Sequence, residues 1–352
     1  MTFPFDPRNK IKQLNFRSVH KNQFIKTVPA TTVFLSSPVQ IVLKMISRRN
    51  IRVKVMQTLY TLSTLKGDVQ PGEPQKLLQK HFDRSKDLLQ YFIYFITEVA
   101  AYAERDSYKR SSKHLPTEHD LHVNTKIAGN EWLWKIKEDE TLKDGWAKSK
   151  PDLQLDKELI QKLYSQLIET QQYKSYISTP ARNRKTEKEM LEFIFEELVL
   201  PNEAFLSHLE EHYNNWDDDG EMVVHLVKGY LQKPGLVDTA KFMSPEKAQF
   251  AKNLLETVLE KEDQLESFIF PKLKNWDAER LAALDMILMK MGVAEFLYFE
   301  TIPPKVTINE YIDLAKEYST QQSGQFVNGI LDNIHKEMAQ NGKLHKTDYR
   351  KA

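Results

Sequence analysis

Residues 47–60 read SRRNIRVKVMQTLY, and they carry the strongest structural signal in the chain. Ser47 is a good N-cap, because its hydroxyl can accept a hydrogen bond from an otherwise unpaired backbone N–H. Ile51, Val55 and Leu59 recur at helical spacing and form one apolar face. The stretch therefore predicts a helix that begins with arginines and buries one side.

The arginines at the start of this predicted helix point to an anionic partner. Arg48 and Arg49 lie four and three residues before Arg52, so the three guanidinium groups can converge. Cations here oppose the positive end of the helix macrodipole, and a phosphate backbone over them would offset that cost. Met56 and Tyr60 extend the same face, where a tyrosine can stack on an unpaired base. The alternative is a solvated basic face with a packed tyrosine.

The C-terminal part of the chain has coherent helical patterns of its own. Leu284 and Leu288 mark the buried face of one helix, and Thr307 and Glu310 have the spacing of a capping box. Gly329 lies inside the last predicted helix, where glycine costs about 1 kcal/mol relative to alanine. It indicates a close approach between two helices, unless it is merely tolerated.

Residues 275–334 contain NWDAERLAALDMILMKMGVAEFL, PPKVTINEYIDLAKEYS and SGQFVNGILDNI. Together with residues 47–60, this block resembles the NusB family of bacterial transcription antitermination factors. The hallmark of that family is an Arg-rich first helix and a V-x-INE…LAK…FVNG…LD tail. The resemblance covers less than a third of the chain. It implies an all-α fold, an antiparallel helical bundle that carries a long helical insertion here, with no catalytic activity and no cofactor.

The resemblance also implies partners and contact residues. Such a protein would bind the boxA element of nascent ribosomal RNA together with NusE, a small-subunit ribosomal protein. The complex then helps RNA polymerase to read through terminators. Gln321-Gln322 stands where many relatives have an acid. Carried over residue by residue, the arginine-rich start, the Q-x-L-Y continuation and the F-V-N-G segment place the RNA contacts at Arg48, Arg49, Arg52, Gln57, Tyr60, Phe326 and Asn328.

Composition excludes several other classes of protein. The 352 residues are 41% hydrophobic and 28% charged, which is typical of a globular protein with one or two domains. Cysteine is absent, so disulfide frameworks and thiolate zinc sites are excluded. The net charge of +1 means that any affinity for nucleic acid must come from a local patch. The most apolar run, residues 88–103, is shorter than the ~20 residues of a membrane span. We therefore expect a soluble, cytoplasmic protein with no membrane contact.

The predicted organisation has five parts. Residues 1–45 form a basic, disordered extension, residues 46–66 the first helix of the NusB-like core, and residues 67–245 the insertion. Residues 246–338 complete the NusB-like core, and residues 339–352 are a basic tail. The first 44 residues hold seven basic residues and one acid, interrupted by four prolines. A basic RNA-binding arm and an organellar presequence are alternatives. We expect instead that Met45 is the natural start.

The predicted insertion alternates between helical and irregular patterns. A strong helical pattern covers residues 75–109, and residues 111–151 are polar and rich in turn-forming residues. Helical periodicity then returns at residues 155–176, 186–199, 202–213 and 220–231.

One string in the insertion is typical of an enzyme. His208 to His212 read HLEEH, the H-x-x-E-H pattern of inverted zinc proteases, in which Glu211 would act as a base. No third ligand with a supporting element follows it. Asp217 to Gly220 read DDDG, which lacks the other ligands of a calcium loop and is a better helix cap. No Gly-rich phosphate loop is present, which also argues against an RNA methyltransferase.

The main rival is a non-catalytic helical scaffold that binds another protein through the insertion. Co-purification with NusE would separate the two hypotheses.

Overall fold

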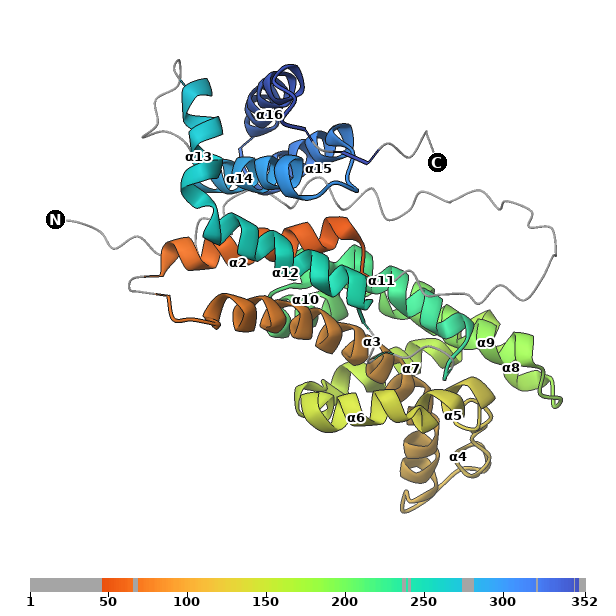
Figure 1. The fold of residues 1–352 in the computed structure, drawn as a ribbon. Coiled ribbons are helices and arrows are strands. Elements are labelled where there is room, and N and C mark those ends of the chain that lie inside the picture. The colour runs from red at the N-terminus through yellow and green to blue at the C-terminus, as the bar shows by residue number, and fades with distance from the viewer. Residues whose placement is uncertain are drawn as a thin grey trace, which may run out of the picture. The chain divides into compact units, whose positions relative to one another are not determined.

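The computed structural model describes residues 46–65, 69–235, 239, 242–273, 282–320, 322–344 and 346–347. All regular elements in these ranges are helices (Figure 1), which confirms the predicted all-α fold. The predicted extension, residues 1–45, lies outside them. None of the described helices is both long enough and apolar enough to cross a membrane.

The helices follow one another with short connections. The first two are α2 (Arg48–Thr64) and α3 (Glu73–Ser111). The middle of the chain forms α4 (Glu118–Leu121), α5 (Glu131–Glu138), α6 (Glu140–Ser149), α7 (Lys157–Glu169), α8 (Gln171–Ser178), α9 (Arg184–Phe193), α10 (Glu203–His212) and α11 (Trp216–Gln232). The C-terminal helices are α12 (Pro245–Glu260), α13 (Glu262–Ile269), α14 (Ala283–Tyr298), α15 (Pro304–Tyr318) and α16 (Ser323–Gln340). Short 3₁₀ turns lie at Pro151–Gln154 and Phe270–Lys272, and a π-helical segment at Ile194–Val199.

The buried side chains fall into two cores. The terminal core is formed by α2, the start of α3 and α12 to α16. The middle core is formed by the rest of α3, helices α5 to α11 and the π-helical segment. Helix α3 belongs to both, since Leu78 and Phe82 pack in the terminal core and residues 88–103 in the middle core. At 1.5 Å per residue, its 39 residues extend over about 58 Å.

Two predicted details of the C-terminal helices are wrong. Helix α15 begins at Pro304, because proline suits the first turn of a helix, so Thr307 lies inside the helix rather than at its cap. Gly329 does not mark a close approach, since a Cβ there would meet no atom within 4 Å. The close approach is at Gly292, where a Cβ would lie 2.9 Å from the methyl carbons of Leu331.

Candidate nucleic-acid interface

Helix α2 is enclosed on most of its circumference. It packs against α3, α12 and α14, as Figure 1 shows, and Val53, Lys54 and Met56 are buried together with the predicted apolar face. Its N-terminus is capped as predicted, because Ser47 Oγ accepts from the N–H of Asn50 at 3.1 Å. A helix that is buried all round belongs to the interior. Only its ends and one strip reach the surface.

Arg52 lies inside the terminal core, with 2% of its surface exposed. Its Nε and Nη2 donate to the two carboxylate oxygens of Glu295 on α14, at 2.7 and 3.0 Å. Thr307 Oγ1 and the Tyr311 hydroxyl donate to the same carboxylate, at 2.9 and 2.8 Å. Burial alone would lower the pKa of Arg52, but Glu295 raises it above its ordinary value. Arg52 therefore joins α2 to α14 and α15 and has no free face for a phosphate.

Arg48 and Arg49 are partly exposed and point to different neighbours. Arg48 Nη2 lies 2.7 Å from Glu246 Oε1 on α12, and Arg49 Nη2 lies 2.7 Å from Glu317 Oε2 on α15. The Cζ atoms of Arg48 and Arg52 each lie 5.6 Å from the centroid of the Phe250 ring. Arg49 and Arg52 both reach Glu310 Oε2 on α15, at 3.9 and 3.4 Å, but Arg52 is buried, so the three guanidinium groups share no exposed face. The structure instead presents two surface arginines above one buried arginine.

The strip of α2 that reaches the surface contains Gln57 and Tyr60, both half-buried. Gln57 Nε2 donates to Asp218 Oδ2 on α11 at 2.6 Å. Tyr60 packs against the edge of the terminal core. A ligand on this strip would therefore meet part of an aromatic ring and a side-chain amide that already has a partner.

The F-V-N-G segment is divided between the interior and the surface. Phe326 and Val327 are buried in the terminal core, whereas Asn328 is exposed on α16. The start of α16 is fixed to α14, because Ser323 Oγ donates to Asp285 Oδ2 at 2.8 Å.

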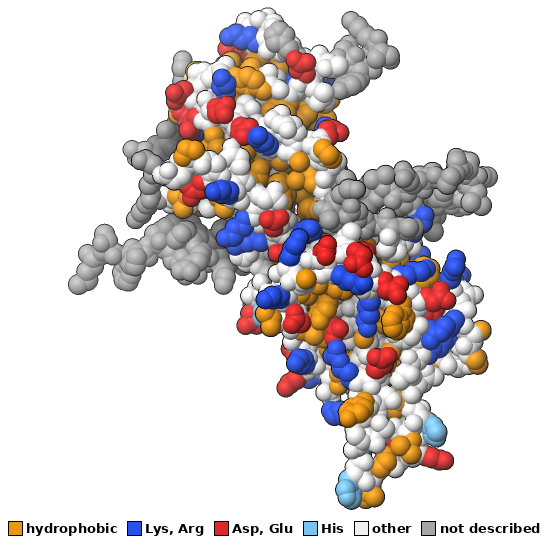
Figure 2. Space-filling model, turned by 60° about the horizontal axis from the view of Figure 1, so that its bottom comes forward, with side chains coloured by type: hydrophobic (Ala, Val, Ile, Leu, Met, Phe, Trp, Pro, Cys, Tyr) orange, Lys and Arg blue, Asp and Glu red, His pale blue; other side chains and the backbone are white. Residues whose placement is uncertain are grey.

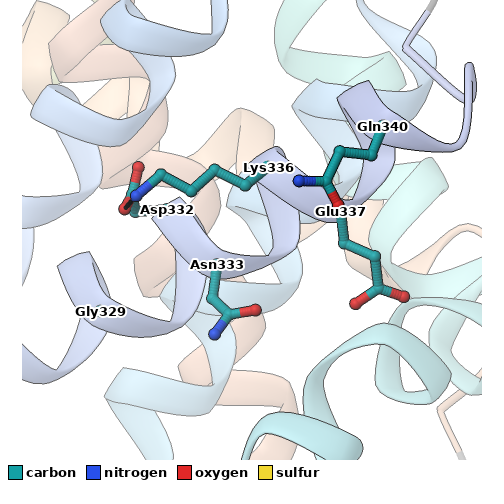
Figure 3. Close-up of a pocket in the computed structure, with 6 residues that line it drawn as sticks. All are labelled: Gly329, Asp332, Asn333, Lys336, Glu337 and Gln340. Carbon is teal, nitrogen blue, oxygen red and sulfur yellow. Dashed lines mark ion pairs between the residues drawn. The ribbon is translucent and has the colours of Figure 1, made fainter.

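Beyond Asn328, the outer face of α16 has a shallow hollow of about 350 Å³. Figure 3 shows that its side chains come from this one helix, and Lys336 Nζ pairs with Asp332 Oδ2 at 2.7 Å. Among the described residues its lining comes from α16 alone, so it can form part of a docking surface but does not enclose a small ligand. It is lined by Gly329, Asp332, Asn333, Lys336, Glu337 and Gln340.

The H-x-x-E-H string has a structural explanation. His208 Nε2 is hydrogen-bonded to the Tyr91 hydroxyl at 2.5 Å, and His212 Nδ1 to the His208 carbonyl at 3.0 Å. Within the described ranges, no three His, Asp or Glu side chains are placed to hold a metal ion. The three aspartates of DDDG lie in the first turn of α11, which begins at Trp216, four residues before the start of the predicted helical pattern at residue 220.

Sequence reasoning missed the contacts that hold α2. Lys54 is fully buried, and its Nζ lies 2.8 Å from Asp219 Oδ1 on α11. The sequence predicted no role for Glu295 and only that of a helix cap for Asp219, because both pair with residues far away in the sequence. The signal in the sequence is that Arg52 and Lys54 lie inside the apolar run from Ile51 to Met56. Cations in such a run indicate buried side chains that need acidic partners.

The chain is similar to known proteins over part of its length. The NusB family profile matches residues 208–336, which begin in α10 and so include residues 208–245 of the predicted insertion. A solved structure of T. maritima NusB is 30% identical to the chain. That match covers 37% of this chain and 83% of the solved chain, at a TM-score of 0.26.

Three curated relatives are named transcription antitermination protein NusB. The chain is 37% identical over 135 residues to that of Chloroherpeton thalassium and covers 64% of its length. It is 45% identical over 83 residues to that of Methylacidiphilum infernorum and covers 58%. It is 36% identical over 131 residues to that of Salinibacter ruber and covers 76% of it. These matches use 36%, 24% and 37% of this chain, in the same order. Since the resemblance extends over more than two thirds of the Salinibacter protein, the chain belongs to the NusB family.

Proposed function

We propose that this protein is a non-catalytic transcription antitermination factor that binds single-stranded boxA RNA together with NusE. The observation that carries the proposal is the pair of surface arginines at the N-terminus of α2. Arg48 and Arg49 are each held by a glutamate on a neighbouring helix, above the buried Arg52–Glu295 pair. The printed names of the curated relatives support the same role. The complex would act on RNA polymerase in the cytoplasm, where the nascent RNA is made.

The two surface ion pairs suit an exchange of one anion for another. Exposed pairs of this kind contribute only about 0–1 kcal/mol, so a phosphate can replace a glutamate at small cost. An arginine whose side chain is already held by an ion pair also loses less conformational entropy when it binds a phosphate. We propose that Arg48 and Arg49 contact phosphates in this way.

The other predicted contact residues divide by exposure. Tyr60 and Gln57 would meet unpaired bases along the strip of α2, and the exposed Asn328 would extend the surface onto α16. Arg52 and Phe326 are buried, so we assign them a supporting role beneath this surface instead of a direct contact.

The test is RNA binding measured over a range of salt concentrations. The chain and NusE together should bind boxA RNA more tightly than either alone, and RNA must strengthen the protein pair by the same factor. Replacing both Arg48 and Arg49 by alanine should flatten the slope of log affinity against log salt by about 1.4, from ~0.7 per phosphate. An unchanged slope in the folded double variant would remove the RNA site from this helix end.

A second candidate is a scaffold that binds a protein through the middle core. It is favoured by exposed apolar side chains near α4, namely Tyr108, Leu115 and Leu121. Figure 2 shows hydrophobic side chains beside histidines at the lower end of the view, where α4 lies. If Leu115→Ser and Leu121→Ser abolish antitermination but leave RNA and NusE binding intact, the scaffold role is supported.

A further inference from the structure

We infer that Asp219 on α11 is a positioning residue for the candidate RNA surface, because it fixes the rotation of α2 through the buried Lys54. The inference rests on the proposed RNA function for its consequence, but the contact itself does not. Through this contact, a residue of α11, a helix of the middle core, orients a helix of the terminal core.

The first step is the saturation of the Asp219 carboxylate. Lys54 Nζ lies 2.8 Å from Oδ1 and 2.9 Å from Oδ2, and both side chains are 1% exposed. Ser85 Oγ on α3 and Asn215 Nδ2 also donate to Oδ2, at 2.6 and 2.7 Å. Donors from α2, α3 and the turn before α11 thus meet at one carboxylate.

The second step leads from Lys54 to the surface strip. Lys54 Nζ also donates to Gln57 Oε1 at 3.4 Å, while Gln57 Nε2 donates to Asp218 at 2.6 Å. Asp218 is further bonded by the Tyr318 hydroxyl of α15. The Gln57 amide is therefore held at Oε1 by Lys54 of its own helix, which Asp219 anchors, and at Nε2 by Asp218 of α11.

The third step connects the aspartates to the middle core. Trp216 begins α11, and its ring lies 5.5 Å from that of the buried Phe92. The ring also covers Gly220, where a Cβ would lie 2.9 Å from it. The first turn of α11, which carries both aspartates, is thus packed tightly against the middle core.

A buried ion pair of this kind is better suited to orientation than to stability. Apolar side chains of the same size often stabilise a protein as well or better, because removing two charges from water is costly. Apolar contacts, however, tolerate sliding and rotation, whereas an ion pair fixes the register of its helices. Rotation of α2 would move Gln57 and Tyr60 away from the positions that they occupy on its exposed strip.

The experiment removes both charges and keeps both shapes, with the double variant Lys54→Met/Asp219→Asn. Lys54→Met alone should lower Tm by several degrees, because it leaves Asp219 buried without its cation, and the double variant should recover most of that loss. Amide hydrogen exchange along α2 in the double variant should nevertheless rise by about tenfold. Exchange as slow as in the unaltered chain would overturn the inference, whether or not RNA binds.

A matched control separates positioning from stability. Asp139→Ala removes a buried carboxylate that caps α6 and accepts from the Tyr230 hydroxyl at 2.8 Å, entirely within the middle core. It should lower Tm without changing exchange in α2.

The RNA readout compares boxA RNA with a shuffled strand of the same length. In the double variant, the preference for boxA should fall by about tenfold, as it should in Gln57→Ala, while Asp139→Ala keeps it. An unchanged preference despite faster exchange would overturn the positioning role. If the unaltered chain binds neither strand, the proposed function fails, and hydrogen exchange alone decides whether Asp219 orients α2.

Discussion

The two cores hold their helices in different ways. In the terminal core, the ionised pair Arg52–Glu295 is buried and joins three helices. In the middle of the chain, buried carboxylates lie near helix ends and accept from neutral donors, and some also pair with a partly exposed or exposed cation, as Glu187 does with Arg182 at 3.3 Å and Asp120 with Lys113 at 2.7 Å. Asp139 caps α6 and accepts from the Tyr230 hydroxyl, and Glu187 accepts from the Tyr176 hydroxyl and the N–H of Glu131.

The helices held by these two kinds of contact differ in length. Helices α5 and α8 have 8 residues each, so a large share of their backbone groups lack an intrahelical partner and need a cap. Helices α2 and α14 have 17 and 16 residues and satisfy most of their own backbone. What long helices need is a fixed rotation against their neighbours. Asp139 therefore ends one helix of the middle core at the start of the next, whereas the Arg52–Glu295 pair orients α2 against α14 in the terminal core.

The largest expected effect is from Glu295→Ala. It leaves the buried Arg52 guanidinium with Glu310 as its one remaining carboxylate partner, 3.4 Å away, and should lower the free energy of unfolding by about 3–5 kcal/mol. Equilibrium unfolding in urea measures this loss. The control is Glu262→Ala, which removes one exposed partner of Lys290 while Glu266 remains at 2.7 Å, and should cost at most about 1 kcal/mol. Equal losses in the two variants would contradict an orienting ion pair.

The two glycines of the terminal core should respond with opposite signs. Gly292→Ala places a Cβ 2.9 Å from the buried Leu331 and should destabilise the protein by about 1–3 kcal/mol. Gly329→Ala meets open space inside a helix and should stabilise it by about 0.5–1 kcal/mol. Thermal melting of both variants tests this contrast, and a stabilising Gly292→Ala would show that Leu331 moves aside freely.

Acid should weaken the junction between the two cores through His81. Burial, together with Lys54 and Arg84, lowers the pKa of His81 from 6.5 to about 4. The folded state therefore favours the neutral ring, and stability should fall by roughly 1–2 kcal/mol as the pH drops from 6.5 through 4. His81→Gln should remove this part of the pH dependence, and His114→Gln, on the surface, should not. The same acid slope in both variants would exclude His81 as the cause.

The smallest expected effect is from Tyr230→Phe in the middle core. It removes one hydroxyl from Asp139, which keeps its bonds to the N–H groups of Thr141 and Leu142. The loss should be about 0.5–1.5 kcal/mol, and faster hydrogen exchange should be confined to α6 and α11. Tyr108→Phe, on an exposed ring, is the control. Faster exchange in α2 would show that the cores are less distinct than we describe.

Much of the fold follows from sequence periodicity. The pattern over residues 75–109 corresponds to α3 (Glu73–Ser111), which begins after Gly72 at a positive φ of 81°. Residues 111–151, expected to be rich in turns, contain α4, α5 and α6. These helices are short, and the caps Asn130 and Asp139 interrupt their apolar pattern. Polar residues that cap helices therefore look like loop residues in the sequence.

The candidate site was only partly predictable for a physical reason. Arg48 and Arg49 lie at a helix end, where composition alone indicates exposure. Arg52 differs because its acceptor, Glu295, lies 243 residues later in the chain. No local pattern distinguishes a buried, paired arginine from a surface one. The spacing of three arginines therefore indicated one site, whereas the structure separates surface contacts from an internal anchor.

The large sequence separation between Arg52 and Glu295 affects how the chain folds during synthesis. Helix α2 emerges early from the ribosome, but Glu295 follows 243 residues later, and closing so long a loop is entropically costly. Asp219 follows Lys54 after only 165 residues, at the end of the middle core. We expect α2 to pack first against α11 and to contact α14 only after α14 has been synthesised. A nascent chain stalled after α11 should then already protect α2 from hydrogen exchange, and Asp219→Ala should abolish that early protection. If α2 is unprotected in the stalled chain with Asp219 and in the stalled Asp219→Ala chain, α2 does not pack against α11 at this stage.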